Sequence, residues 1–342
     1  MKRPLLLLGI LAAFFFSWVS FREIPMVVIG QPTSTGQMQR YKEVPFFQHL
    51  QEVTGLPVKV TYSPLDAVGY KDTYQLKMLK DGVFDLVSLR FIQNSDVEPS
   101  LVGIDPVGMS SDWETTRRIV RDYSPTVDRY LQDTYSAKLL GVWTFGPQYF
   151  YCNKPIRGVA DLHGLKVRVG SEFMGKLIKS LGATPIMVSF DDTKSALAIG
   201  MLDCAITSGA SGNHAGWPEH TKFYFPLAVQ FGLNGYAISL KKWNKFSKQE
   251  QQTLKAAVDH YVADLWRFSQ ELDREVTDCN IGRPCRNGTS YQMVLVEPST
   301  QDVLALKEAA KSKFLTDWFE RCEHVHPGCR REWSEKVMPL VY

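Results

Sequence analysis

Arg168 is the residue whose type and position best fit ligand chemistry, because it stands where a predicted strand meets a predicted helix. Residues 165–169 form a short apolar run with β-branched side chains, which predicts a strand. Residues 170–181 then repeat apolar side chains at helical spacing. Open α/β sheets bind ligands at the carboxyl ends of strands, and the free N–H groups of a helix start favour an anion. A guanidinium there matches a carboxylate with two parallel hydrogen bonds; the alternative is an exposed arginine paired with a neighbouring acid.

The segment around Arg168 alternates strands and helices. Two further strands are predicted at residues 185–188 and 202–207, and the helix between them begins at a capping residue, Ser189. Short links between such elements predict a parallel α/β unit.

The same order of elements is predicted earlier in the chain. Two units with the same order predict two similar lobes with a cleft between them. A polar loop is predicted at residues 32–40. The strands and helices of this first unit are predicted at residues 26–31, 44–53, 58–62, 72–80 and 84–89.

Three motifs in the second unit together resemble the solute-binding proteins of tripartite ATP-independent periplasmic (TRAP) transporters. They are Asp-Leu-His-Gly-Leu-Lys-Val-Arg-Val at 161–169, Gly-Ala-Thr-Pro at 182–185, and Ala-Leu-Ala-Ile-Gly-Met-Leu-Asp at 196–203. The resemblance implies an α/β, two-lobed periplasmic binding protein fold, with a ligand cleft between the lobes and a long helix spanning both. It also implies a receptor that captures a small carboxylate-containing organic acid and delivers it to the membrane-embedded subunits of a TRAP transporter.

The resemblance assigns site residues on the second lobe. Arg168 matches the family's anchor for the ligand carboxylate. A second position, often arginine in the family, is Gln148 here, which removes one charge and favours a neutral or aromatic ligand body. Phe190 falls where the family often places an aromatic ring against the ligand; the alternative is a hydrophobic cap on the following helix. Thr207 falls where many members carry asparagine.

Four further candidates flank these positions. Ser208 and Asn213 bound a segment rich in glycine, serine and asparagine, which either hydrogen-bonds the ligand or forms an ordinary turn. Arg90 and Gln93 follow a first-lobe strand and are expected to face the cleft from the other side. Arg90 either restores the charge missing at Gln148 or forms a surface ion pair. Because the acid that precedes Thr207 in metal-binding members is absent, neither a metal nor a cofactor is expected.

The expected domain division follows from these units. A helix opened by a capping box at Ser247 is predicted to reach about residue 278, and a last helix is predicted over 300–320. The resemblance implies that residues 139–152, which are extended and rich in aromatics, cross between the lobes. The expected boundaries are 26–145 for lobe 1, completed by part of 230–260; 146–229 for lobe 2, completed by part of 261–320; and 321–342 for a C-terminal segment.

Composition narrows the class of function. The chain has 342 residues and a net charge of +3, too small and too scattered to indicate nucleic-acid binding. No Gly-x-Ser-x-Gly, His-Glu-x-x-His or phosphate-binding glycine loop is present, so the chain is not expected to be an enzyme. The alternatives are a periplasmic sensor that feeds a signalling protein, and an enzyme that uses Cys204 or a histidine. A monomer is expected.

The first 22 residues read as an export signal. Lys2 and Arg3 precede an apolar run that is shorter than the ~20 residues needed to span a bilayer. The segment is expected to be cleaved, with an uncleaved membrane anchor as the alternative, and the folded part is expected in the periplasm.

The six cysteines fit an oxidising compartment. Short loops favour two disulfides, Cys279–Cys285 and Cys322–Cys329. The second pair, with His324 and His326 between its members, has zinc ligation as its alternative. Cys152 and Cys204 lie in strand-like runs and are expected to be small buried hydrophobic residues instead of a redox pair.

Overall fold

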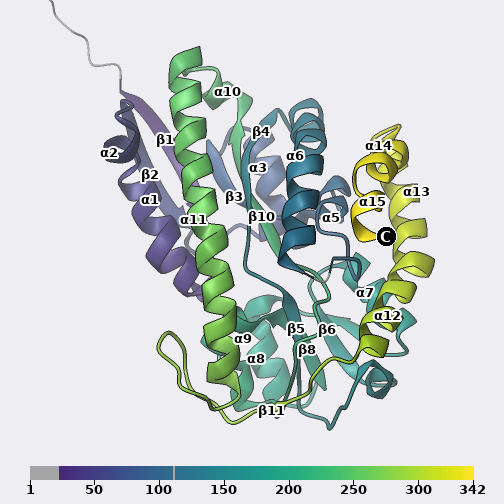
Figure 1. Ribbon diagram of the computed structural model, residues 1–342. Helices are drawn as coiled ribbons and strands as arrows, with labels where there is room; N and C mark the ends of the chain where they lie inside the picture. Colours follow the sequence, from purple (N-terminus) through teal and green to yellow (C-terminus); the bar gives the residue numbers. More distant parts are fainter. Residues whose placement is uncertain (1–22, 111) are drawn as a thin grey trace, which may run out of the picture.

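Each of the two lobes is built on its own β-sheet in the computed structural model, which describes residues 23–110 and 112–342 (Figure 1). The first sheet has the order β2 (Val58–Pro64), β1 (Ile24–Gly30), β3 (Leu86–Arg90), β10 (Leu233–Ser239) and β4 (Ala137–Thr144). The second has the order β11 (Val294–Leu295), β9 (Phe223–Phe225), β5 (Gln148–Cys152), β8 (Cys204–Ser208), β6 (Lys166–Val169) and β7 (Thr184–Met187).

The two sheets share one topology. In each, three strands run parallel in the spatial order second, first, third: β2-β1-β3 and β7-β6-β8. An antiparallel strand follows on the same side, β10 beside β3 and β5 beside β8. Right-handed crossover helices explain the parallel part, as the strand–helix alternation predicts. The predicted two-lobed α/β fold is confirmed.

The chain passes between the lobes at two crossings that lie side by side. Strand β4 of the first sheet continues into β5 of the second, and the segment after β9 returns to β10. The two crossings are hydrogen-bonded to each other: Gln148 N–H donates to Gln230 C=O at 2.7 Å, and Phe145 N–H donates to Gly232 C=O at 3.2 Å. Gly232 has φ of +58°, a left-handed conformation that glycine adopts without strain. The predicted crossing within residues 139–152 is thus present.

Helices cover both sheets near the predicted positions. The first lobe has α1 (Val44–Gln48), α2 (Leu50–Thr54), α3 (Gln75–Lys80), α4 (Phe91–Asn94), α5 (Ser100–Gly103) and α6 (Trp113–Tyr135). The second has α7 (Glu172–Ser180), α8 (Phe190–Ala198) and α9 (Gly209–His214). Later in the chain follow α10 (Leu240–Trp243), α11 (Lys248–Asn280), α12 (Thr300–Ala309), α13 (Leu315–Val325), α14 (Cys329–Lys336) and α15 (Met338–Val341).

Two predicted segments differ in detail. The loop predicted at 32–40 contains a short 3-10 helix, Thr33–Thr35, and the start of a wide π-helical turn, Gln39–Glu43. The wide turn precedes Pro45, which has no N–H to continue an ordinary helical ladder. A similar turn at Ala310–Phe314 divides the predicted helix 300–320 into α12 and α13.

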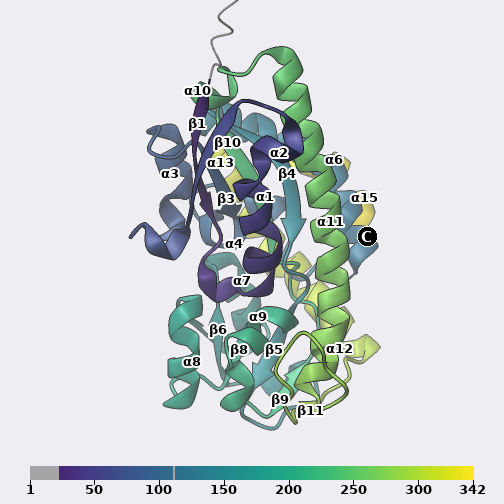
Figure 2. The same cartoon turned by 90° about the vertical axis from the view of Figure 1, so that its left-hand side faces the viewer.

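Helix α11 is the spine of the molecule and lies along both lobes in two perpendicular views (Figures 1 and 2). Its capping box is present: Glu250 N–H donates to Ser247 Oγ, and Ser247 N–H donates to the Glu250 carboxylate. Leu254 and Val258 pack in the first-lobe core, whereas Leu272 and Val276 pack near Ala210 of the second lobe. The predicted long helix is confirmed.

The C-terminal helices form a second connection between the lobes. On the second-lobe side, the Asp302 carboxylate of α12 accepts a hydrogen bond from Val159 N–H at 2.7 Å. On the first-lobe side, Trp318 Nε1 donates to Pro99 C=O at 2.7 Å, and Trp333 Nε1 donates to Gly103 C=O at 2.8 Å. Residues 321–342 thereby pack against the first lobe, beside α6 in Figure 1.

The six cysteines form three disulfides, and one of them corrects the sequence analysis. Cys279–Cys285 and Cys322–Cys329 are paired as predicted. Cys152 and Cys204 are also paired, not free hydrophobic residues: they stand directly opposite each other on β5 and β8, with their Cα atoms 4.0 Å apart. Two strands far apart in sequence meet here, so spacing alone could not reveal the pair.

Cys322 and Cys329, considered above as zinc ligands, are bonded to each other in a disulfide. Among the described residues, no group of three histidine, cysteine or acidic side chains is placed to hold a metal. His326 is buried instead beside the Glu98 carboxylate, with Nε2 2.8 Å from Oε1, and stacks on the Tyr130 ring.

The predicted signal segment, residues 1–22, lies outside the described residues. Within residues 23–110 and 112–342, none of the helices combines the length and the apolar character needed to cross a bilayer.

A first prediction concerns the cysteine pairs. The purified, unreduced and unfolded protein should show no reactive thiols, because all six cysteines are paired. Thiol titration with and without reduction measures this, and peptide mapping identifies the partners. Two thiols mapped to Cys152 and Cys204 would show that the cross-strand pair does not form.

Asp273 on α11 is a buried carboxyl beneath the second sheet. Tyr149 donates its hydroxyl to Oδ2 at 3.2 Å, while Oδ1 has no hydrogen-bond partner among the described residues. Burial raises the pKa of Asp273 to about 7 from the ordinary value of 3.8. Between these values the folded chain holds a proton that the unfolded chain releases, so stability falls as pH rises through this window.

A second prediction follows for Asp273→Asn. Removing the buried charge should raise the free energy of unfolding, and the gain should be larger at pH 8 than at pH 5 by ~2 kcal/mol. Urea unfolding at both pH values measures the gain. Asp259→Asn, at an exposed site on the same helix, is the matched control and should change stability by less than ~0.5 kcal/mol at either pH. A gain for Asp273→Asn that does not depend on pH would contradict the assigned titration.

Candidate ligand-binding site

A buried cavity lies where the two lobes meet. Its volume is about 40 Å³, room for roughly three waters at ~10–15 Å³ each. Residues of both lobes and of the crossings line it. Six of the eight residues predicted as site residues are among them: Arg90, Gln93, Gln148, Arg168, Phe190 and Thr207. The structure therefore brings most of the candidates to one place, and their contact with a ligand stays a prediction.

Arg168 is held rigidly at the second-lobe wall of this cavity. Its side chain lies at the end of β6 and the residue is 5% exposed. Nε donates to Val188 C=O at 3.0 Å, and Nη1 donates to Ile206 C=O at 2.9 Å. The Trp217 ring lies 5.8 Å from the guanidinium carbon. These contacts fix the orientation of the guanidinium without neutralising it.

The charge of Arg168 is unmatched within the described part of the chain. No carboxylate of residues 23–110 or 112–342 forms an ion pair with its guanidinium. Burial, and to a smaller extent the nearby Arg90 cation, lower the pKa of Arg168 to about 10, and the Asp72 carboxylate behind Arg90 opposes this shift. A buried cation without a counter-ion is the arrangement expected where a ligand supplies the anion.

Gly170 keeps the space beside that guanidinium open. A Cβ atom there would lie 3.8 Å from both Nη atoms of Arg168 and 3.1 Å from Ile92 of the opposite lobe. Ser171 then caps α7, accepting a hydrogen bond from Met174 N–H at 3.2 Å. A glycine before a helix start thus leaves room for a ligand group against Arg168.

Gln148 lies in one crossing, at the start of β5. Its Nε2 donates to Gly146 C=O at 2.8 Å, and the residue is 7% exposed. A Cβ at Gly232 would lie 2.4 Å from this Nε2, so the glycine makes room for the amide. The second-lobe position that is often arginine in the family therefore presents a neutral amide to the cavity.

Arg90 faces the cavity from the first lobe, where β3 ends. Arg90 lines the cavity and also forms an ion pair, so its role toward a ligand stays a prediction. Its Nη1 lies 2.9 Å from Asp72 Oδ2, but the pair is mostly buried instead of lying on the surface. Burial lowers the pKa of Arg90, and the Asp72 and Asp191 carboxylates oppose that shift.

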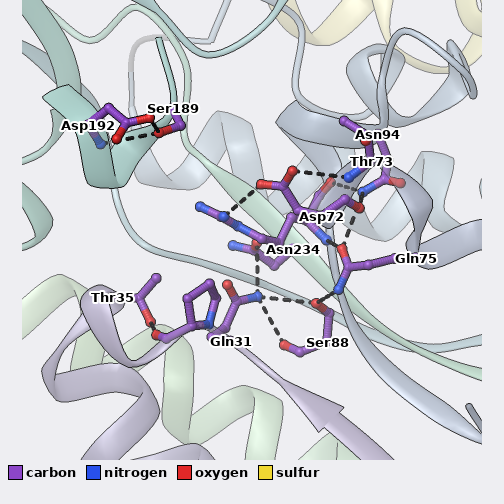
Figure 3. Close-up of polar contacts among 12 residues, drawn as sticks. Gln31, Thr35, Asp72, Thr73, Gln75, Ser88, Asn94, Ser189, Asp192 and Asn234 are labelled. Atoms are coloured by element: carbon purple, nitrogen blue, oxygen red, sulfur yellow. Dashed lines mark hydrogen bonds and ion pairs between the residues drawn. The ribbon is translucent and has the colours of Figure 1, made fainter. Parts of the chain in front are cut away.

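A hydrogen-bonded network supports the first-lobe wall (Figure 3). Gln31 Nε2 donates to Ser88 Oγ at 3.0 Å and to Asn234 Oδ1 at 3.3 Å, and Gln75 Nε2 donates to Ser88 C=O at 2.9 Å. Asn234 itself lines the cavity. The sequence analysis missed Asn234 because it becomes a neighbour of Arg90 only through the β3–β10 register.

Phe190, Thr207 and Gln93 complete the predicted set that lines the cavity. Phe190 is the first residue of α8 and its ring packs against Trp217, with centroids 5.3 Å apart. It therefore faces the cavity while it also packs at the start of its helix. Thr207 is buried in β8, one residue after the carbonyl that holds Arg168.

Ser208 and Asn213 do not line the cavity, and their side chains have structural partners. Ser208 caps α9, accepting from Ser211 N–H at 3.2 Å. Asn213 Nδ2 donates to Asn280 Oδ1 and to Thr289 C=O, both at 2.8 Å. These two residues tie the second lobe together, and Ser211 between them is the member of the segment that reaches the cavity.

Comparison with known proteins settles the family. The family of bacterial extracellular solute-binding proteins, family 7, matches residues 30–314. The chain belongs to this family. This family match confirms the predicted resemblance to TRAP solute-binding proteins, and solved structures with the same fold carry that description.

Three solved structures illustrate the shared fold of family 7. The receptor DctP7 of Bordetella pertussis, which binds pyroglutamic acid, has a TM-score of 0.78 at 16% identity, over 92% of this chain and 99% of that one. A TRAP periplasmic solute-binding protein of Desulfovibrio salexigens with orotic acid has 0.80 at 14% identity, over 93% and 100%. One of Rhodoferax ferrireducens with malonate has 0.79 at 16% identity, over 92% and 98%.

Two curated relatives match at the sequence level. YiiZ of Salmonella typhimurium is 30% identical over 164 residues, 46% of this chain, and a Haemophilus influenzae protein is 22% identical over 202 residues, 55% of this chain. The chain spans 49% and 61% of the lengths of these relatives.

A third prediction tests Arg168 as the anchor. Arg168→Ala should weaken binding of a small carboxylic acid by ~30-fold to several thousand-fold, since losing one partner of a desolvated charge pair costs ~2–5 kcal/mol. Arg168→Lys should recover part of the loss, because an ammonium cannot make the planar two-bond contact. Calorimetry measures this with whichever acid of a thermal-shift panel stabilises wild type most.

The matched control is Arg157→Ala, an arginine of the same lobe whose side chain is 92% exposed. It should bind as wild type does. If Arg168→Ala binds within about threefold of wild type, ~0.65 kcal/mol, the carboxylate is held elsewhere.

Proposed function

We propose that this chain is a periplasmic receptor that captures a small carboxylate-containing organic acid and delivers it to the membrane-embedded subunits of a TRAP-type secondary transporter. The observation that carries the proposal is the buried, unmatched Arg168 guanidinium in a cavity between two lobes. A fixed cation in a buried cavity favours an anionic ligand, and the planar guanidinium, which can donate two parallel hydrogen bonds, favours a carboxylate.

The family supports the carboxylate class. Three structures that share the fold contain pyroglutamate, orotate or malonate, each a small carboxylic acid, and one of Desulfovibrio desulfuricans contains sn-glycerol-3-phosphate, a phosphate ester. The two lobes are joined by crossings at residues 145–147 and 230–232. This arrangement supports capture by closure of the lobes, with the crossings as the hinge.

The alternatives have less support from the described site. Cys204, the thiol considered for an enzyme, is bonded to Cys152 and offers no thiolate. Histidine and carboxylate side chains are absent from the described lining of the cavity, so it holds no evident acid–base pair. A receptor that feeds a sensor uses the same binding chemistry, and the partner distinguishes it from a transport receptor.

A fourth prediction tests capture by closure. Because Arg168 is buried in the structure described here, a ligand reaches it only after the lobes separate, and binding should then favour the compact form. Small-angle scattering should show the radius of gyration decreasing when the stabilising acid is added, and Arg168→Ala should show no decrease at the same concentration.

Mass spectrometry of the acid extracted from purified protein identifies the natural ligand. Uptake of that acid into vesicles that contain the cognate membrane subunits should require the receptor. A radius of gyration that stays unchanged at saturation would contradict closure, and uptake that does not need the receptor would contradict delivery.

A further inference from the structure

We infer that the site selects acids with a single carboxylate, because Asp72 neutralises Arg90 and leaves Arg168 as the unmatched cation of the described cavity wall. The inference rests on the proposed receptor function and specifies its ligand class. It concerns the side of the cavity opposite the anchor, where a second carboxylate of a diacid would lie.

The charges around the cavity carry the argument. Of the described residues that line it, Arg90 and Arg168 are the charged ones. Asp72 lies behind Arg90, with Oδ2 2.9 Å from Nη1, and the two side chains are 11% and 26% exposed. A pair this sheltered is weakly screened by solvent, so its net charge at the cavity is close to zero.

Asp72 is fixed in this role by its own hydrogen bonds. Oδ1 accepts from Thr73 N–H at 3.0 Å, and the Asp72 carbonyl accepts from Asn94 Nδ2 at 3.0 Å. The Arg90 backbone N–H donates to Gln75 Oε1 at 3.0 Å. This bond ties the end of β3 to Gln75, the first residue of α3. Figure 3 shows Asp72, Gln75 and Asn94 gathered in one group. The ion pair is thus part of a built structure and not a chance surface contact.

The other groups on this side are neutral. Gln93 and Asn234 present amides from the first lobe, Gln148 presents one from the crossing, and Thr35 presents a hydroxyl that is already bonded to Pro32 C=O at 2.6 Å. A second carboxylate would leave water without gaining a free cation, and an uncompensated buried charge is strongly unfavourable. A neutral carbonyl, amide or hydroxyl at the same place loses far less hydration free energy than a carboxylate does.

Arg90 still has a donor for such a neutral group. Its Nε is buried and has no hydrogen-bond partner among the described residues. A ligand oxygen could accept from it without carrying a charge. The structure therefore points to a compact monocarboxylic acid that has a neutral hydrogen-bond acceptor away from its carboxylate.

A fifth prediction compares half-amides with diacids of the same shape. The probes are succinamate with succinate and glutaramate with glutarate, each pair differing in one amide for one carboxylate, together with pyroglutamate and malonate. Thermal shift ranks the probes on the full-length exported protein, and calorimetry gives the dissociation constants. Wild type should bind the better half-amide, or pyroglutamate, at least tenfold more tightly than any diacid in the set.

Asp72→Asn should change that preference. The substitution keeps the shape of the side chain but frees the Arg90 charge, so the ratio of diacid to monoacid affinity should rise at least tenfold. Asp81→Asn removes the same charge from an exposed pair in the same lobe and should leave the ratio unchanged. The double variant D72N/R90Q is neutral again and should return the ratio to that of wild type. The double variant also carries the test if Asp72→Asn alone does not fold.

The outcomes separate the two proposals. A wild type that binds a diacid as tightly as its half-amide overturns the charge inference and leaves the receptor function standing. A double variant that gains diacid affinity, or an unchanged ratio in folded Asp72→Asn, also overturns the inference. A wild type that responds to no acid in the set, in the same way as Arg168→Ala, contradicts the proposed function itself.

Discussion

The buried guanidinium of Arg168 is the constraint on which the site depends. A cation taken out of water is costly unless another charge compensates it, and here the described chain supplies two neutral carbonyls instead. The carbonyls of Val188 and Ile206 accept the hydrogen bonds of the guanidinium. Val188 follows β7 and Ile206 lies in β8, and these two strands flank β6. The parallel unit therefore fixes the orientation of the guanidinium before any ligand arrives, which is the preorganisation that a carboxylate site requires.

The crossings carry the second constraint, since they must hold both walls of the cavity in register. Asp105 is buried beside the returning strand and accepts hydrogen bonds from Phe231 N–H at 2.9 Å and Leu233 N–H at 3.0 Å. Burial raises the pKa of this carboxyl to about 6, and the backbone donors oppose that rise. A carboxylate between two donors clamps the segment around Gly232, next to the Gln148 amide. The crossings proposed as the hinge thus also form one wall of the cavity.

A feature could be predicted from the sequence when the residues that determine it lie close together in the chain. The strands, the caps at Ser189 and Ser247, and the position of Arg168 depend on neighbours a few residues away, and the sequence predicted them. The Cys152–Cys204 disulfide and the place of Asn234 beside Arg90 depend on antiparallel pairing between distant segments. No local spacing encodes such pairing. Asn213 was misleading for a related reason, because its partners Asn280 and Thr289 come from a later part of the chain.

Affinity and selectivity have separate locations in this arrangement. The second lobe holds the unmatched cation, which attracts any small carboxylate, whereas the first lobe offers amides and an arginine whose charge Asp72 already balances. A ligand bound to the second lobe alone would leave its far end in water, where a second charge costs nothing. In the proposed receptor, closure of the first lobe would remove that water, so discrimination against a second carboxylate would arise at the closing step. The inferred role of the ion pair between Arg90 and Asp72 is then to determine which ligands stabilise the closed form, without direct contact with the ligand carboxylate.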